Sequence, residues 1–173
     1  MSPRAALLVG GLFLLAACST GANTPASSGT PGVAGISSNR PASLDGVDPC
    51  TLIDQSGRGA LGITTEAHNG VNVSASSSCG WLLGDDYYLT ISLFTQVGLG
   101  DLALPAGATV TSVRGRAGKK IIKTDGPGCS LYLAGTAHSS VQIDVDQGKD
   151  AETACYDTLK AAFVVDGRLP AAP

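Results

Sequence analysis

The sequence predicts an α+β domain in which an antiparallel meander of about six strands lies between an N-terminal and a C-terminal helix, both packed on the sheet. Three observations predict this class. Apolar and polar residues alternate through much of 71–145, the pattern of half-buried strands. Segments with helix signals flank this region, and four cysteines are spaced so that two disulfides can join the helices to the sheet.

The first 17 residues are predicted to be a lipoprotein signal peptide. Arg4 precedes an uncharged apolar run over 5–15, which is shorter than the ~20 residues that span a bilayer and typical of a secretory signal. The tetrapeptide that ends this run, Leu15-Ala16-Ala17-Cys18, resembles the bacterial lipobox. By this resemblance Cys18 becomes the lipidated first residue of the mature protein, and two or three acyl chains make a stable anchor. The alternative is an ordinary secretory signal followed by a chance cysteine.

Residues 19–43 are predicted to be a disordered tether. They are Gly, Ala, Ser, Thr, Pro and Asn with few apolar residues, and Arg40 is their only charge, so they carry too little apolar surface to offset chain entropy. The predicted organisation is therefore a signal peptide at 1–17, a lipid-anchored tether at 18–43, one domain at 44–170 and a tail at 171–173.

The first helix is expected to start at Pro49. Asp48 can cap the free N–H groups of a helix, and proline suits the first helical position. Leu52 and Ile53 would point inward. Glycines crowd the residues that follow, so this helix is expected to end at about Ser56.

Alternation of apolar and polar residues places the strands. The first two strands form one hairpin, the next two form a second and basic hairpin, and two further strands follow. The six expected strands cover about 71–83, 87–95, 109–113, 117–124, 129–133 and 141–145. Trp81 is expected in the core beside Cys79.

The last element is a helix over about 149–164, with Asp150 as its cap. One stripe of apolar residues at helical spacing is expected to face the sheet. It consists of Ala151, Ala154, Cys155, Leu159, Ala162 and Phe163.

With Cys18 assigned to lipid, four cysteines remain, and an even number in an exported chain indicates two disulfides. Cys129 shares a strand face with apolar residues and Cys155 lies on the helical stripe, so both should point into one core. Cys50 and Cys79 stand in the same relation at the start of the domain. The expected pairs are Cys50–Cys79 and Cys129–Cys155, and the other two connectivities remain open. No Cys-x-x-Cys pair occurs, which argues against a redox centre or a zinc ribbon.

Several short motifs resemble one known family. They are Asp48-Pro49-Cys50, Cys79-Gly80-Trp81, Gly115-Arg116-Ala117, Cys129 and Cys155, in this order after the lipobox. The chain is similar over about 44–170 to the actinobacterial lipoprotein family called domain of unknown function 3558. The resemblance implies an envelope lipoprotein with no established activity. The glycine-containing run over 54–59 departs from the family's pattern in the first helix.

Charge and composition limit the classes of partner that this protein is expected to bind. The chain has 11 basic and 14 acidic residues, and without Arg4 the mature chain has 10 against 14, a net charge of −4. This balance excludes nucleic acid as a main partner. Half of the mature basic residues still gather in the second hairpin, where they could contact anionic lipid headgroups or wall polymer. They are Arg114, Arg116, Lys119, Lys120 and Lys123. The alternative is a solvated hairpin whose lysines discourage edge-to-edge pairing.

No catalytic or metal-binding motif stands out. The acidic segment 144–150 hints at a calcium loop, but glycine and Lys149 stand at the fifth and sixth positions, where such a loop needs an oxygen ligand and glycine. His68 and His138 are isolated in polar surroundings. We therefore expect no metal, no cofactor and no enzyme activity, with a hydrolase built by the fold around one of these histidines as a remote alternative.

The function expected from the sequence is a non-enzymatic binding or accessory module, anchored by lipid to the outer face of the cytoplasmic membrane. Its partner would be an envelope protein. The alternative is a carrier of lipid or of a small apolar ligand, and the modest aromatic content of 5% favours the protein partner.

Overall fold

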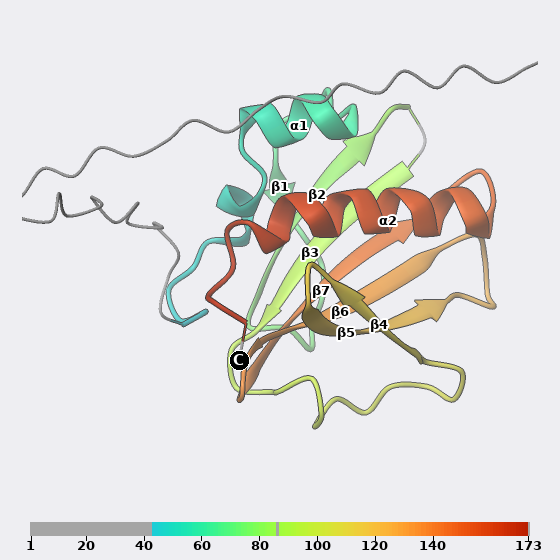
Figure 1. Ribbon diagram of the computed structural model, residues 1–173. Coiled ribbons are helices and arrows are strands. Elements are labelled where there is room, and N and C mark those ends of the chain that lie inside the picture. Colours follow the sequence, from blue (N-terminus) through green and yellow to red (C-terminus); the bar gives the residue numbers. More distant parts are fainter. Residues whose placement is uncertain (1–42, 86, 173) are drawn as a thin grey trace, which may run out of the picture. The chain divides into compact units, whose positions relative to one another are not determined.

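Seven strands form one antiparallel sheet with helices on one face in the computed structural model, which describes residues 43–85 and 87–172 (Figure 1). The spatial order is β1-β2-β3-β7-β6-β5-β4. The strands are β1 (His68–Asn69), β2 (Ser77–Leu83), β3 (Tyr87–Phe94), β4 (Thr109–Val113), β5 (Arg116–Ile122), β6 (Cys129–Thr136) and β7 (Ser139–Asp146). The predicted α+β class and its antiparallel sheet are confirmed. The predicted signal peptide and tether, with Cys18, lie outside the described residues.

The strand order departs from a simple meander at one place, because β3 pairs with β7 and not with β4. Burial explains the difference. Strand β7 is buried at six of its eight positions and occupies the centre of the sheet, whereas Thr109, Val110 and Ser112 of β4 are exposed and this strand lies at an edge. Residues 95–108 carry the chain from the middle of the sheet to that edge (Figure 1).

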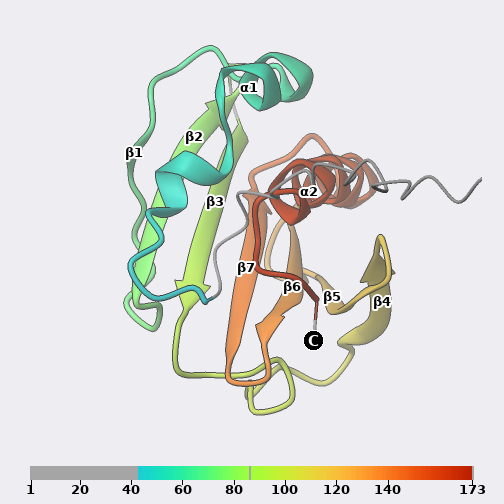
Figure 2. The same cartoon turned by 60° about the vertical axis from the view of Figure 1, so that its left-hand side comes forward.

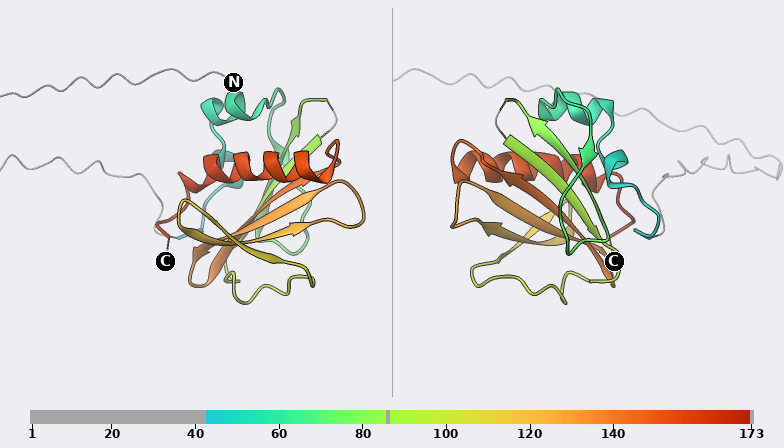
Figure 3. Two further views of the ribbon diagram at one scale, coloured as in Figure 1. Left: turned by 45° about the vertical axis from the view of Figure 1, so that its right-hand side comes forward. Right: turned by 180° about the vertical axis from the view of Figure 1, so that it is seen from behind.

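The helices lie over the apolar face of the sheet. Helix α2 (Ala151–Asp166) packs across β6 and β7, and the 3₁₀ helix η1 (Pro49–Leu52) packs on β2 and β3 (Figure 2). Between them and the sheet lies a continuous core that includes Trp81, Ile91 and Ile143. Seen from behind in Figure 3, the strands lie in front of the helices.

The predicted first helix is two helices, because η1 ends at Leu52 and a separate helix contains the glycines. After η1, a second helix α1 (Gln55–Leu61) begins at Asp54, whose carboxylate accepts a hydrogen bond from the Gly57 N–H at 2.8 Å. A Cβ atom at Gly57 would lie 2.7 Å from Val164 Cγ1 of α2. Glycine therefore permits the close packing of α1 against α2, which a propensity argument does not include.

The segment expected to open the first strand is a loop. Val71 and Val73 are both exposed, and β2 starts only at Ser77. The Asn72 side chain accepts a hydrogen bond from the Ser74 N–H at 3.1 Å, which makes a local turn. Its amide group also donates to Ser92 Oγ and Gln142 Oε1 on the face of the sheet away from the helices. Alternation of apolar residues was thus misleading here.

Helix α2 is rotated relative to the predicted stripe. Its buried residues are Ala154, Thr158, Ala161, Ala162, Val165 and Asp166. Small side chains let the helix lie close to the sheet, and Leu159 and Phe163, which we expected in the core, are both 40% exposed. The predicted cap is confirmed, since Asp150 Oδ1 accepts the Thr153 N–H at 2.7 Å.

Candidate interaction surface

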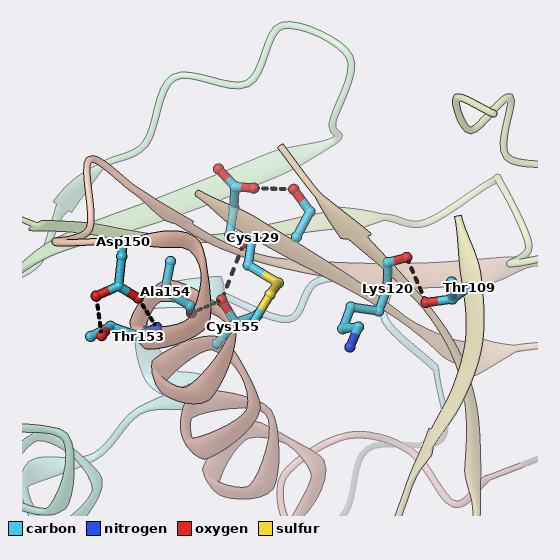
Figure 4. Close-up of a disulfide and its surroundings, with 10 residues drawn as sticks. Thr109, Lys120, Cys129, Asp150, Thr153, Ala154 and Cys155 are labelled. Atoms are coloured by element: carbon cyan, nitrogen blue, oxygen red, sulfur yellow. Dashed lines mark hydrogen bonds between the residues drawn. A yellow bond between two sulfur atoms is a disulfide. The ribbon is translucent and has the colours of Figure 1, made fainter. Parts of the chain in front are cut away.

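Two disulfides join the helical layer to the sheet, with the predicted pairing Cys50–Cys79 and Cys129–Cys155. Their Cα atoms are 5.2 and 4.9 Å apart, and they close segments of 29 and 26 residues. Figure 4 shows the second disulfide. Beside it, the Thr158 hydroxyl lies 3.1 Å from the Cys129 carbonyl and 2.7 Å from the Ala154 carbonyl and shares its hydrogen between them. Helix α2 is therefore held to β6 by a covalent bond and a buried hydrogen bond.

Arg116 corrects the prediction of a basic surface patch, because its side chain is only 1% exposed. Its Nε donates to Asp166 Oδ1 at 2.6 Å, Nη1 to the Ala134 carbonyl at 2.7 Å and Nη2 to the Pro170 carbonyl at 2.6 Å. These bonds tie β5, β6, the end of α2 and the C-terminal segment together. The planar guanidinium suits such a set of acceptors, and lysine could not reproduce it. Arg116 is a structural residue.

Lys123 also does not act as a free surface cation. Its ammonium group contacts Asp144 and Asp146, and the Ser130 hydroxyl donates to Asp144. Burial lowers the pKa of Lys123, but the two carboxylates outweigh burial and raise this pKa above its ordinary value. Burial and the neighbouring Asp146 raise the pKa of Asp144, whereas the pKa of Asp146 is lowered because hydrogen bonds from Asp144 and Lys123 outweigh its burial. The cluster lies on the face of the sheet away from the helices.

The other three basic residues of the second hairpin are distributed differently. The Arg114 guanidinium carbon lies 5.6 Å from the centre of the Phe163 ring, a cation–π distance. Lys119 and Lys120 are half-buried and point to opposite faces of β5, because neighbouring strand residues alternate. In the part of the chain that the structure describes, neither lysine has a salt-bridge partner.

Three large side chains form an exposed stripe along α2, at positions i, i+3 and i+7. Tyr156 is 64% exposed, and Leu159 and Phe163 are each 40% exposed. Lys160 lies over the Tyr156 ring at 5.5 Å, and Arg114 lies over Phe163, so the stripe is apolar with cationic neighbours. We call these three residues the α2 stripe. Sequence reasoning placed two of them in the core.

A groove lies between the α2 stripe and the β4–β5 hairpin, with a volume of about 230 Å³. Figure 4 shows Lys120 and Thr109 on the hairpin side and the disulfide on the helix side. We call this the hairpin groove. Its walls are Thr111, Lys120, Cys129, Leu131, Cys155, Tyr156, Thr158 and Leu159. It forms because α2 covers β6 and β7 and leaves the same face of β5 and β4 mostly uncovered.

A larger hollow of about 910 Å³ lies between the N-terminal segment and the end of α2. Four charged residues, Asp48, Asp54, Arg114 and Arg168, line it together with small residues and with apolar ones that include Leu52, Phe163 and Val164. Arg168 and Asp54 form an ion pair across it. A hydrogen bond from the Gly57 N–H and one from Ser56 lower the pKa of Asp54. This hollow therefore has mixed walls, with four charged side chains where the hairpin groove has one, Lys120.

The histidines and acidic residues form no metal-binding cluster within the described residues. His68 lies on β1 and His138 follows β6, and both are exposed. Asp144 and Asp146, which suggested calcium, are ion-paired with Lys123. No described helix is long and apolar enough to cross a membrane.

A family model described as "Protein of unknown function (DUF3558)" matches residues 13–167, which is most of the chain. The chain belongs to the DUF3558 family. No curated protein and no solved structure matches it. The match spans both disulfides, Arg116 and the α2 stripe. Because the DUF3558 family is described as one of unknown function, membership assigns no activity to this chain.

Sequence reasoning missed the α2 stripe and the role of Arg116. One signal was present for the stripe, since Tyr156 stands one helical turn before Leu159 and two before Phe163. A second signal was the run of small residues Ala154, Thr158, Ala161 and Ala162, which suits close packing on a sheet. Reading the small residues as the buried face would have left the large ones exposed.

Proposed function

We propose that this DUF3558 protein is an actinobacterial lipoprotein, anchored through acyl chains on Cys18 to the outer face of the cytoplasmic membrane. The lipobox at 15–18 supports this proposal. Two disulfides support it independently, because such bonds persist in oxidising compartments outside the cytoplasm. Residues 19–43 would serve as the tether between the lipid and the folded domain.

Replacing Cys18 with alanine tests the anchor. The variant should leave the membrane fraction and accumulate as soluble or unprocessed protein, because the thioether that carries the lipid cannot form. Fractionation of cells followed by immunoblotting measures this, and Ser19→Ala is the matched control that keeps the thiol. Membrane retention of Cys18→Ala with a normally cut N-terminus would refute the lipobox assignment.

We further propose that the domain is a non-enzymatic module that binds an envelope protein through the α2 stripe. The observation that carries this proposal is the exposure of Tyr156, Leu159 and Phe163, of which the first two line the hairpin groove and the third lines the larger hollow. Exposed aromatic side chains with a neighbouring arginine are the residue types that dominate the energy of protein interfaces. Rigid attachment of α2 by Cys129–Cys155 favours binding, since little conformational freedom remains to be lost.

The lipid-carrier alternative has less support. The space between helices and sheet is filled by the core residues. The hairpin groove, at about 230 Å³, is below the ~300–1,000 Å³ that is usual for small-molecule pockets. The larger hollow has four charged side chains among the apolar ones in its walls, which disfavours a purely apolar ligand. The hydrolase alternative required a histidine beside a carboxylate in a cleft, and His68 and His138 are both exposed.

Photocrosslinking tests the protein partner. Benzoylphenylalanine in place of Tyr156, in the full-length chain in its own membranes, should give a discrete covalent adduct with one protein. The same substitution at Tyr88, which is 44% exposed on the opposite face of the sheet, is the matched control. Leu159→Asp should abolish the Tyr156 adduct because it places a charge in the apolar contact, whereas Val71→Asp on an exposed loop should not.

No adduct at Tyr156, or equal adducts at Tyr156 and Tyr88, would refute the proposed binding surface. An adduct of lipid mass would instead support the carrier alternative.

A further inference from the structure

Strand β4 lies at one edge of the sheet and has none of the usual features that prevent an edge strand from pairing with another strand. It pairs with β5 on one side, and no described strand pairs with its other side (Figures 1 and 3). Its sequence, Thr-Val-Thr-Ser-Val, has high β-propensity and contains neither proline nor a charge. Proteins usually protect an edge with lysine, proline or a bulge. The strand at the opposite edge, β1, has only two residues and is too short to pair well with another strand.

The turn after β4 determines which of its amides are free. Arg114 and Gly115 form a two-residue loop with φ of 49° and 85°, as in a type I′ turn. In such a hairpin the flanking pair, Val113 and Arg116, is hydrogen-bonded, and pairs then alternate along the strands. Thr111 and Thr109 therefore bond to β5, whereas the N–H and C=O groups of Val110 and Ser112 point away from the sheet. Val110 is also 89% exposed.

Charge indicates what can pair with this edge. Residues 109–122 contain no acidic residue. Arg114 lies in the turn that ends β4, and Lys119 and Lys120 lie on β5, opposite Val110 and Thr109. A second copy of this chain would bring like charges together at a two-fold interface, which is unfavourable. The chain's own residues 19–43 contain no acidic residue either. An acidic segment of another protein would be complementary.

We propose that the free edge of β4 takes up an extended, acidic segment of the partner protein as an eighth strand. This inference rests on the proposed function and specifies how the partner binds. The added strand would receive main-chain hydrogen bonds from Val110 and Ser112, the usual source of affinity in strand addition. Side chains on one face of the segment would lie toward Thr111, Lys120 and the hairpin groove. Those on the other face would meet Val110 and Lys119.

A synthetic peptide of about eight residues, with valine and glutamate in alternation, tests this mode on the purified full-length lipoprotein in neutral detergent micelles. Fluorescence anisotropy of the labelled peptide should show saturable binding. The matched peptide with lysine in place of glutamate should bind at least about tenfold more weakly, because it repels the hairpin. Hydrogen exchange resolved by residue should slow at Val110 and Ser112 when the acidic peptide is bound.

Two variants of β4 separate backbone from side-chain effects. Val110→Pro removes an outward N–H without removing a bond to β5 and should weaken the acidic peptide at least about tenfold. Val110→Thr keeps the N–H and should change binding less than about twofold. If Val110→Pro fails to fold, hydrogen exchange at Val110 and Ser112 of the unmodified chain still tests the inference.

Three results would overturn the inference: no saturable binding of the acidic peptide, equal binding of the lysine peptide, or unchanged exchange at Val110 and Ser112 on binding. The proposed function has its own outcome. A protein adduct at Tyr156 in membranes together with any of these three results would leave the binding module standing and refute strand addition. Absence of the Tyr156 adduct would remove the basis for both.

Discussion

Replacing Arg116 with methionine should lower the free energy of unfolding by about 3–5 kcal/mol, which is typical when one partner of a buried ion pair is removed. Methionine fills a similar volume but donates no hydrogen bond. The Asp166 carboxylate would lose its cation, and the Ala134 and Pro170 carbonyls would lose their charged donor. These groups are too deeply placed for water to replace the guanidinium without rearrangement.

Urea denaturation of the oxidised protein measures this effect. Lys119→Met is the matched control on the same strand and should change stability by less than about 0.5–1 kcal/mol, since Lys119 has no ion pair among the described residues. Combining Arg116→Met with Asp166→Leu should recover part of the loss, because it removes the buried carboxylate as well. A loss below about 1 kcal/mol for Arg116→Met would show that this network contributes little.

Removing the Cys129–Cys155 disulfide by replacing both cysteines with alanine should cost about 2–5 kcal/mol. In the chain-entropy account, the bond restrains a loop of 26 residues in the unfolded chain. It also attaches α2 to β6 beside the Thr158–Cys129 hydrogen bond. The loss should therefore be accompanied by a weaker adduct at Tyr156, because the α2 stripe is presented by this helix.

The matched comparison is removal of Cys50–Cys79, which closes a loop of similar length, 29 residues, but attaches η1. It should destabilise the domain to a similar extent and leave the Tyr156 adduct intact once the protein is folded. Equal loss of the adduct in both variants would indicate general unfolding and contradict a specific role for Cys129–Cys155 in presenting α2.

The disulfide pairing was predictable because it depends on the faces of elements and on little else. Cys129 alternates with Leu131 and Leu133 on the buried face of β6. Cys155 was assigned to the core through the stripe it shares with Leu159, which is 40% exposed, so this half of the argument reached the right pair from an inexact helix face. The antiparallel sheet was predictable for the same reason. Strand order was not, since pairing of β3 with β7 depends on how deeply β7 is buried.

The errors share a cause, which is that residue type was used as a guide to burial. Arginine at position 116 was expected at the surface, but it lies on the same face of the sheet as Gly118 of β5 and the core residue Leu133 of β6. Val71 and Val73 were placed in a strand, although Asn72 makes a turn there. Leu159 and Phe163 were placed in the core because they are large and apolar, but the residues of α2 that pack on the sheet are mostly small. At each of these positions burial depends on which residues pack against the side chain, and these neighbours cannot be identified from one sequence.

Mass spectrometry of the Tyr156 photoadduct tests most directly the claim that this DUF3558 protein is a protein-binding module. Our account predicts an adduct of protein mass at Tyr156, none at Tyr88, and its loss in Leu159→Asp. An adduct of lipid mass, or protein adducts that survive Leu159→Asp, would contradict the account.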